Sequence, residues 1–129
     1  VLDLAIEKSA HALIDTGSLL AGITNGDAAL RLASSSKIKS RFEGVIFFQV
    51  DDKSALSGSW MVISCATLVI QPMQQSPILQ SNAFILFDDA RCRGSDFKMK
   101  GDATALITLG MELTKDKLMQ GISTTLIII

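Results

Sequence analysis

Asp15 and Cys92 are the two side chains of this sequence whose surroundings could support hydrolytic chemistry. Asp15 begins the segment Asp-Thr-Gly-Ser at positions 15–18, directly after an apolar run. Two carboxylates that share one proton can activate a water molecule, and two copies of this loop in a dimer would supply such a pair. Aspartate and glycine are also common in plain turns that follow strands. Asp15 therefore has two interpretations, a dimeric aspartic protease and a structural turn, of which the turn is the commoner.

Cys92 lies between two cations, Arg91 and Arg93, which favour the reactive thiolate form of a cysteine. A cysteine nucleophile also needs a base, and His11 is the only histidine in the chain. Cys92 with His11 is thus the one pairing that a cysteine peptidase or deubiquitinase could use. The plain alternative is a small loop cysteine and an uninvolved histidine. Cys65 lies inside an apolar run and is expected in the core.

The composition predicts one folded domain over residues 1–129, because 48% of the residues are hydrophobic and 19% are charged. A net charge of -1 gives no general attraction to nucleic acid or to an anionic membrane. The longest purely apolar run, at positions 126–129, is far shorter than the roughly 20 residues of a membrane-spanning helix. This unprotected apolar end also leads us to expect a piece of a larger chain.

The two cysteines are far apart and have no CxxC partner, so the sequence predicts no metal site and no cofactor. Free thiols of this kind favour a reducing intracellular compartment such as the cytoplasm. No signal peptide is recognisable, because Asp3, Glu7 and Lys8 interrupt the first apolar residues.

Continuous apolar runs predict most of the secondary structure. A short helix should begin after Thr24, with Ala28, Leu30, Leu32 and Ala33 as its apolar residues and a loose serine-rich end at positions 34–36. A second helix is expected at positions 113–120, and a loop at positions 71–80. Strands are expected at positions 12–17, 44–50, 60–70, 83–87 and 104–110.

Strands that are continuously apolar rather than alternating are typical of a parallel sheet covered on both faces. The expected fold class is therefore α/β, a doubly wound and mostly parallel sheet. The loops after Asp15, Val50, Phe87 and Gly110 should lie at one edge of it, where such sheets place their sites.

Three segments strongly resemble the C-terminal part of a family of very large, poorly characterised eukaryotic proteins, often labelled ubiquitinyl hydrolases. They lie at positions 87–98, 105–110 and 114–120. The stretch at positions 13–22 is similar to an upstream pattern of the same family, so the resemblance covers about residues 12–120. In that family this region resembles the second RecA-like domain of superfamily-two helicases. The resemblance implies a RecA-like sheet, complete or in part.

The resemblance carries over one helicase element, an Arg-Gly-x-Asp sequence after a strand, which this chain has at positions 93–96. A glycine there lets the backbone approach a phosphate or a nucleic-acid strand, and the aspartate orients a neighbouring group. The plain alternative is a charged turn. The resemblance implies weak nucleotide or nucleic-acid contacts, and its binding residues would be Arg91, Arg93, Gly94, Asp96, Lys98 and Gln120.

A second helicase element, Gln-x-x-x-Arg-x-Arg, begins at Gln120 but has Thr124 and Leu126 in place of its arginines. Those arginines would neutralise charge on the γ-phosphate during phosphoryl transfer. The chain also has no GxxxxGK[ST] phosphate loop. The sequence therefore predicts a degenerate, non-catalytic helicase-like module, a binding or structural subunit with protein partners in a larger assembly, and the alternative is a hydrolase that uses Asp15 or Cys92.

Overall fold

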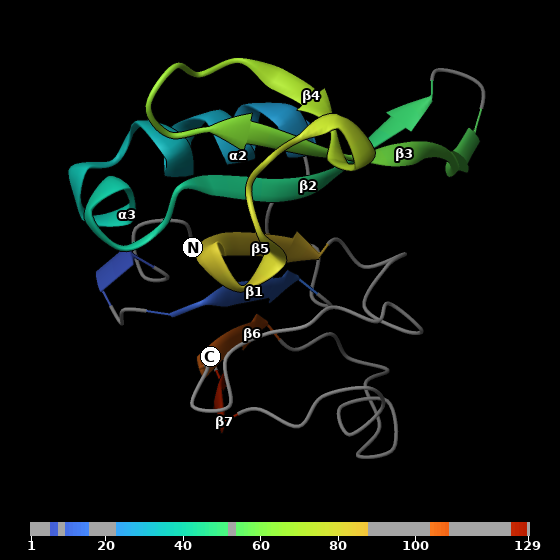
Figure 1. The fold of residues 1–129 in the computed structure, drawn as a ribbon. Helices are drawn as coiled ribbons and strands as arrows, with labels where there is room; N and C mark the ends of the chain where they lie inside the picture. Colours follow the sequence, from blue (N-terminus) through green and yellow to red (C-terminus); the bar gives the residue numbers. More distant parts are fainter. Residues whose placement is uncertain are drawn as a thin grey trace.

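The computed structural model describes residues 6–7, 10–15, 23–51, 54–87, 104–108 and 125–128. Its strands form one mixed sheet of seven strands in the order β4-β3-β2-β5-β1-β6-β7 (Figure 1). The strands are β1 (Ala12–Asp15), β2 (Gly44–Asp51), β3 (Ser54–Ser64), β4 (Ile70–Pro72), β5 (Ala83–Phe87), β6 (Thr104–Thr108) and β7 (Thr125–Ile128). The helices are α2 (Asn25–Ser34) and α3 (Ser36–Arg41), and the 3-10 turns are η1 (Met73–Gln75) and η2 (Gln80–Asn82).

Five neighbouring strands of the sheet are parallel, and the other two are antiparallel. β1 pairs in parallel with both β5 and β6, β5 with β2, and β6 with β7. β3 runs antiparallel to β2, and β4 antiparallel to β3. β2 and β3 are separated by two residues, a connection long enough for a hairpin and too short for a parallel crossover. The α/β class is therefore confirmed, with a sheet that is only partly parallel.

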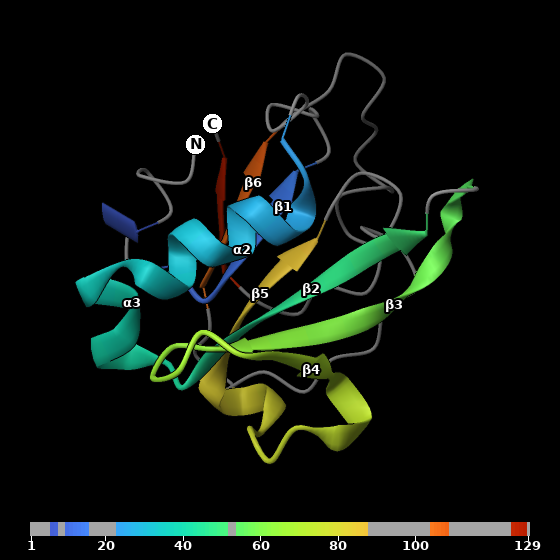
Figure 2. The same cartoon turned by 90° about the horizontal axis from the view of Figure 1, so that it is seen from above.

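The central strands are buried on both faces, which explains their continuous apolar sequences. One face packs against α2 and α3, which lie on the same side of the sheet (Figure 2). The strand residues of this face are Leu13, Val45, Phe47, Ile63, Phe84, Leu86 and Leu106. The opposite face has its own buried cluster, formed by Ala12, Ile14, Ile46, Val62, Ala83, Ile85, Phe87 and Ala105. All five residues of β5 are buried, as expected for a central strand.

The strand expected at positions 60–70 is wrong. β3 ends at Ser64, a turn follows, and the chain returns as the separate strand β4. Leu68 in this turn has a φ of 58°, a left-handed conformation that no strand residue adopts. The hydrophobic pattern missed the turn because Leu68, Val69 and Ile70 are apolar.

Two further details of the sequence prediction need correction. The serine-rich segment after α2 is not a loose end, because α3 begins at Ser36 and buries Ile38. The loop expected at positions 71–80 includes the end of β4, all of η1 and the start of η2. The helix expected at positions 113–120 lies outside the described residues. No helix in the described part of the chain is long and apolar enough to cross a membrane.

Candidate functional site

The carboxyl ends of four parallel strands lie along one edge of the sheet. They are Asp15 of β1, Asp51 of β2, Phe87 of β5 and Thr108 of β6. In the register of β1 and β6, Asp15 lies opposite Thr108. Open α/β sheets bind ligands beyond this edge. The expectation that these strands end at a common edge is confirmed, and we call it the carboxyl edge.

Helix α2 begins near this edge and is fixed there by two polar side chains. The hydroxyl of Thr24 accepts a hydrogen bond of 3.0 Å from the backbone N–H of Asp27, which caps the helix. The side-chain amide of Asn25 donates a hydrogen bond of 2.9 Å to the backbone carbonyl of Phe48 in β2. The bond of Asn25 ties the first turn of α2 to β2, while the Thr24 cap closes that turn.

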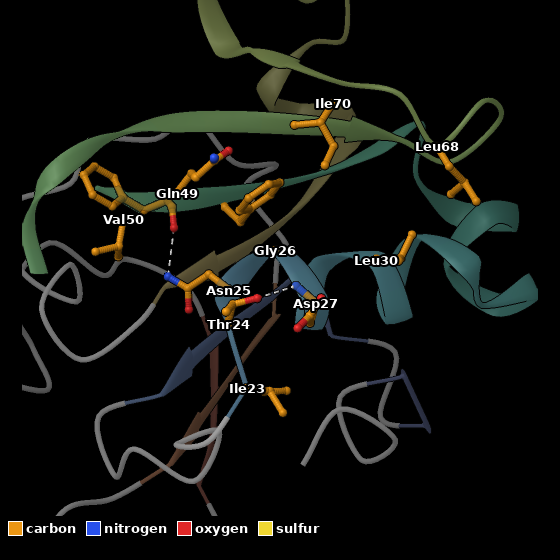
Figure 3. Close-up of a pocket in the computed structure, with 12 residues that line it drawn as sticks. Ile23, Thr24, Asn25, Gly26, Asp27, Leu30, Gln49, Val50, Leu68 and Ile70 are labelled. Atoms are coloured by element: carbon orange, nitrogen blue, oxygen red, sulfur yellow. Dashed lines mark hydrogen bonds between the residues drawn. The ribbon is translucent and has the colours of Figure 1, made fainter. Parts of the chain in front are cut away.

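A groove of about 620 Å³ lies between the first turns of α2, the end of β2 and the turn that joins β3 to β4 (Figure 3). Phe47, which is buried, forms part of its lining. The remaining lining residues are Ile23, Thr24, Asn25, Gly26, Asp27, Leu30, Phe48, Gln49, Val50, Leu68 and Ile70. The groove arises because α2 packs on β2 and more lightly on β3, so β4 is left uncovered on this face.

Four large apolar side chains of this groove are exposed: 42% of Leu30, 41% of Val50, 39% of Leu68 and 45% of Ile70. Leu30 stands on α2, while Leu68 and Ile70 come from the β3–β4 side and extend over the groove (Figure 3). Single exposed apolar residues need no explanation, but several around one concavity are typical of a binding surface. The groove can therefore bury apolar atoms of a ligand.

The left-handed backbone of Leu68 is held by its own turn. The N–H of Leu68 donates to the carbonyl of Ser64 at 2.8 Å, and the N–H of Val69 donates to the hydroxyl of Thr67 at 3.4 Å. A bulky residue in this conformation costs on the order of 1–2 kcal/mol relative to a right-handed one. Such strain persists only where the surroundings enforce it, and it is frequent at functional sites.

The residues singled out from the sequence are not brought together by the described structure. Asp15 lies at the carboxyl end of β1, whereas His11 immediately precedes the amino end of the same strand. The half-buried ring of His11 contacts the edge of Phe42, with 5.8 Å between ring centroids. Cys92, Arg91, Arg93, Gly94, Asp96, Lys98 and Gln120 lie outside the described residues. The pairing of Cys92 with His11 and the pairing of two Asp15 carboxylates stay predictions.

Cys65 is buried in the core, as its apolar surroundings predicted. Burial raises the pKa of its thiol, and the nearby Lys39 ammonium offsets part of that rise. Cys65 is thus held as a neutral thiol with little nucleophilic character. Within the ranges that the structure describes, no cluster of three His, Cys, Asp or Glu residues is arranged to hold a metal ion.

Sequence reasoning missed the groove, although part of its signal was present. Ala28, Ala29, Leu32 and Ala33 define the buried arc of α2, and Leu30 lies roughly 130° from the middle of that arc at 100° per residue. A helical projection would therefore have placed Leu30 outside the core. The approach of β4 and the β3–β4 turn to α2 carries no local sequence signal.

The fold and the groove together define an α/β protein with an apolar groove that runs along α2 and β2 from the first turn of the helix to the β3–β4 turn. Comparison with known protein families, with curated proteins and with solved structures finds no match for this chain.

Proposed function

We propose that this chain is a non-catalytic binding module of a larger protein or assembly, built on a doubly wound, RecA-like sheet whose helicase elements are degenerate. The apolar groove along α2 and β2 carries this proposal, because it gathers four exposed large apolar side chains around one concavity. The resemblance of residues 87–98, 105–110 and 114–120 to helicase-like segments supports the RecA-like part of the proposal.

The lining of the groove favours binding over catalysis. Thr24 and Asn25 use their polar groups to hold α2, through the cap on Asp27 and the bond to Phe48. The large side chains at the rim are apolar and can bury surface, but they can neither move a proton nor attack a bond. The described lining residues include one carboxylate, Asp27, and no second ionisable group beside it, so the groove is better suited to binding than to catalysis.

A second contact surface is proposed on the segment that follows β5. Arg91, Arg93, Asp96 and Lys98 come a few residues after Phe87, whose strand ends at the carboxyl edge. Arginine and lysine there would contact phosphate groups of a nucleotide or nucleic acid. This surface would act beside the groove and is independent of it.

Photo-crosslinking in cells that make the protein tests the binding function. A photoreactive residue is placed at Leu30, in the groove, and at Leu79, which is 63% exposed and does not line it. We expect the Leu30 position to give a discrete adduct with a protein and the Leu79 position to give none. Equal adducts from both positions, or none from either, would contradict a binding surface here.

An ATP hydrolysis assay, with and without single-stranded nucleic acid, tests the non-catalytic part. We expect no turnover above the buffer rate, because Thr124 and Leu126 replace the arginines of the helicase element. ATP hydrolysis that is lost in an Arg93→Glu variant would show that the chain is an active ATPase. Peptide cleavage at acid pH that disappears in Asp15→Asn would instead establish the hydrolase alternative.

A further inference from the structure

We propose that the groove between α2 and the β3–β4 turn binds a short apolar peptide segment that carries a basic side chain, contributed by a protein partner. The inference rests on the proposed binding function and names the chemistry of its ligand. Three features of the groove carry it: the apolar rim, the strained backbone of Leu68 and the charge of Asp27.

The rim selects an apolar ligand. Leu30, Leu68 and Ile70 face the groove from two sides, and each leaves about two fifths of its surface in water. Burying such surface is the dominant favourable term in protein association. A peptide whose apolar side chains enter between α2 and β4 would remove this surface from water on both sides at once.

The backbone of Leu68 points to the same conclusion independently. At a φ of 58°, glycine would fit the turn without steric cost, and asparagine would tolerate it better than leucine does. A leucine there is strained, and its side chain is 39% exposed rather than buried in the core. The strain is therefore not offset by full burial within the chain, and a ligand that covers Leu68 would supply the missing contact.

The charge of the groove argues against phosphate and for a cation. Among the described residues that line it, Asp27 is the one with a charged side chain, and it is exposed. A helix N-terminus can attract a phosphate, but the N–H of Asp27 is already bound by Thr24, and the Asp27 carboxylate would repel an anion. No ion pair of this carboxylate is formed within the described ranges, so a lysine or arginine of the ligand can pair with it.

Selection from a random peptide library tests the proposal without assuming a sequence. Peptides of about 12 residues, long enough for a helical or extended ligand, are selected on the immobilised chain, and their affinities are measured by fluorescence anisotropy. We expect the selected peptides to be enriched in leucine, isoleucine and phenylalanine together with lysine or arginine.

Matched variants assign the binding to the groove. Leu68→Asn should weaken binding about tenfold, because asparagine tolerates the left-handed conformation but removes the apolar contact. Leu79→Asn removes a leucine that is still more exposed and lies outside the groove, and it should leave the affinity unchanged. Asp27→Asn should lower the affinity for the selected peptides about threefold and reduce the salt dependence of binding, as expected for an exposed ion pair.

The outcomes separate the failure of this proposal from that of the binding function. Peptides that bind Leu68→Asn as tightly as the original chain, or that are enriched in acidic residues, would overturn the groove assignment. If Leu68→Asn does not fold, Leu30→Gln replaces it in the test, because glutamine is a good helix former and this variant also removes an apolar side chain of the groove. It should likewise lower the affinity for the peptides. Binding that survives both variants but is lost in Arg93→Glu would leave the binding function intact and place it elsewhere.

A single-stranded oligonucleotide serves as the competing ligand. We expect it not to displace the selected peptides, because it would bring phosphates to Asp27. Displacement that depends on Leu68 would overturn the peptide assignment in favour of nucleic acid. Failure to select any peptide, together with no adduct at Leu30, would overturn both the groove assignment and the binding function.

Discussion

Replacing Gly58 by alanine should destabilise the β2–β3 hairpin, whereas the same replacement at Gly26 should stabilise the fold. Gly58 lies opposite Val50 in the hairpin and has a φ of 154°. A methyl group there would overlap the backbone carbonyl oxygen of Gln49 and come within 2.7 Å of the ring of Phe48. Neither group can yield easily, since one belongs to the backbone of β2 and the other packs edge-on against Trp60 at 5.4 Å.

The magnitude follows from these two costs. A strained backbone conformation costs about 1–3 kcal/mol, and an overpacked side chain costs about 1–3 kcal/mol. Gly58→Ala should therefore lower the free energy of unfolding by about 2–6 kcal/mol, a large part of the roughly 5–15 kcal/mol that a domain has. At Gly26, by contrast, the methyl group would lie 3.8 Å from the ring of Phe47, an ordinary contact. Alanine in a helix there should add about 0.5 kcal/mol.

Urea unfolding followed by tryptophan fluorescence measures both changes. Trp60 is the only tryptophan of the chain and lies in β3, two residues from Gly58, so its signal reports directly on the hairpin. Because the two variants carry the same chemical change, their difference isolates the local geometry. A Gly58→Ala variant within about 1 kcal/mol of the original chain would refute the register of β2 and β3. So would two variants that shift stability in the same direction.

Two further predictions concern α2 and Cys65. Thr24→Ala should lower the free energy of unfolding by about 1 kcal/mol through loss of the cap on Asp27, whereas Thr24→Ser should retain most of it, as urea unfolding would measure. The raised pKa of Cys65 means that the unfolded thiol ionises first, so stability should fall as the pH rises above the ordinary thiol value of 9.0, and less in Cys65→Ala. Thiol labelling should find Cys65 protected until unfolding, and Cys92 labelling far faster than a free thiol would support the cysteine peptidase alternative.

The buried elements could be predicted because local pattern and tertiary burial agree in them. β1, β2, β5 and β6 are apolar on both faces, and both faces are covered, so continuous apolar runs identify them correctly. Thr24 likewise marks the start of α2, because a threonine cap acts on N–H groups only three residues away. The common carboxyl edge then follows from the parallel pairing alone.

Other elements depend on information that a local pattern does not contain. α3 is six residues long and buries one apolar residue, Ile38, so it has almost no hydrophobic period to detect. The turn between β3 and β4 contains neither glycine nor proline, and its reversal rests on the left-handed Leu68 and on hydrogen bonds to Ser64. Among the candidate site residues, His11 and Asp15 flank the strand predicted at positions 12–17, so their places at its two ends follow from the sequence, whereas the ring contact of His11 with Phe42 required the fold.

Two apolar residues that the strand prediction placed incorrectly, Leu68 and Ile70, lie on the rim of the groove together with Leu30 and Val50. Leu30 was named only as an apolar residue of its helix, and Leu68 and Ile70 were expected inside one long strand; all three are exposed and line the same concavity. A large apolar side chain that stays exposed to water adds little to the stability of the isolated fold. Three such residues from distant segments meet in one groove, and one of them is held in a strained conformation. This coincidence is what a surface shaped for a ligand would produce, and it is the physical reason to look for the ligand there first.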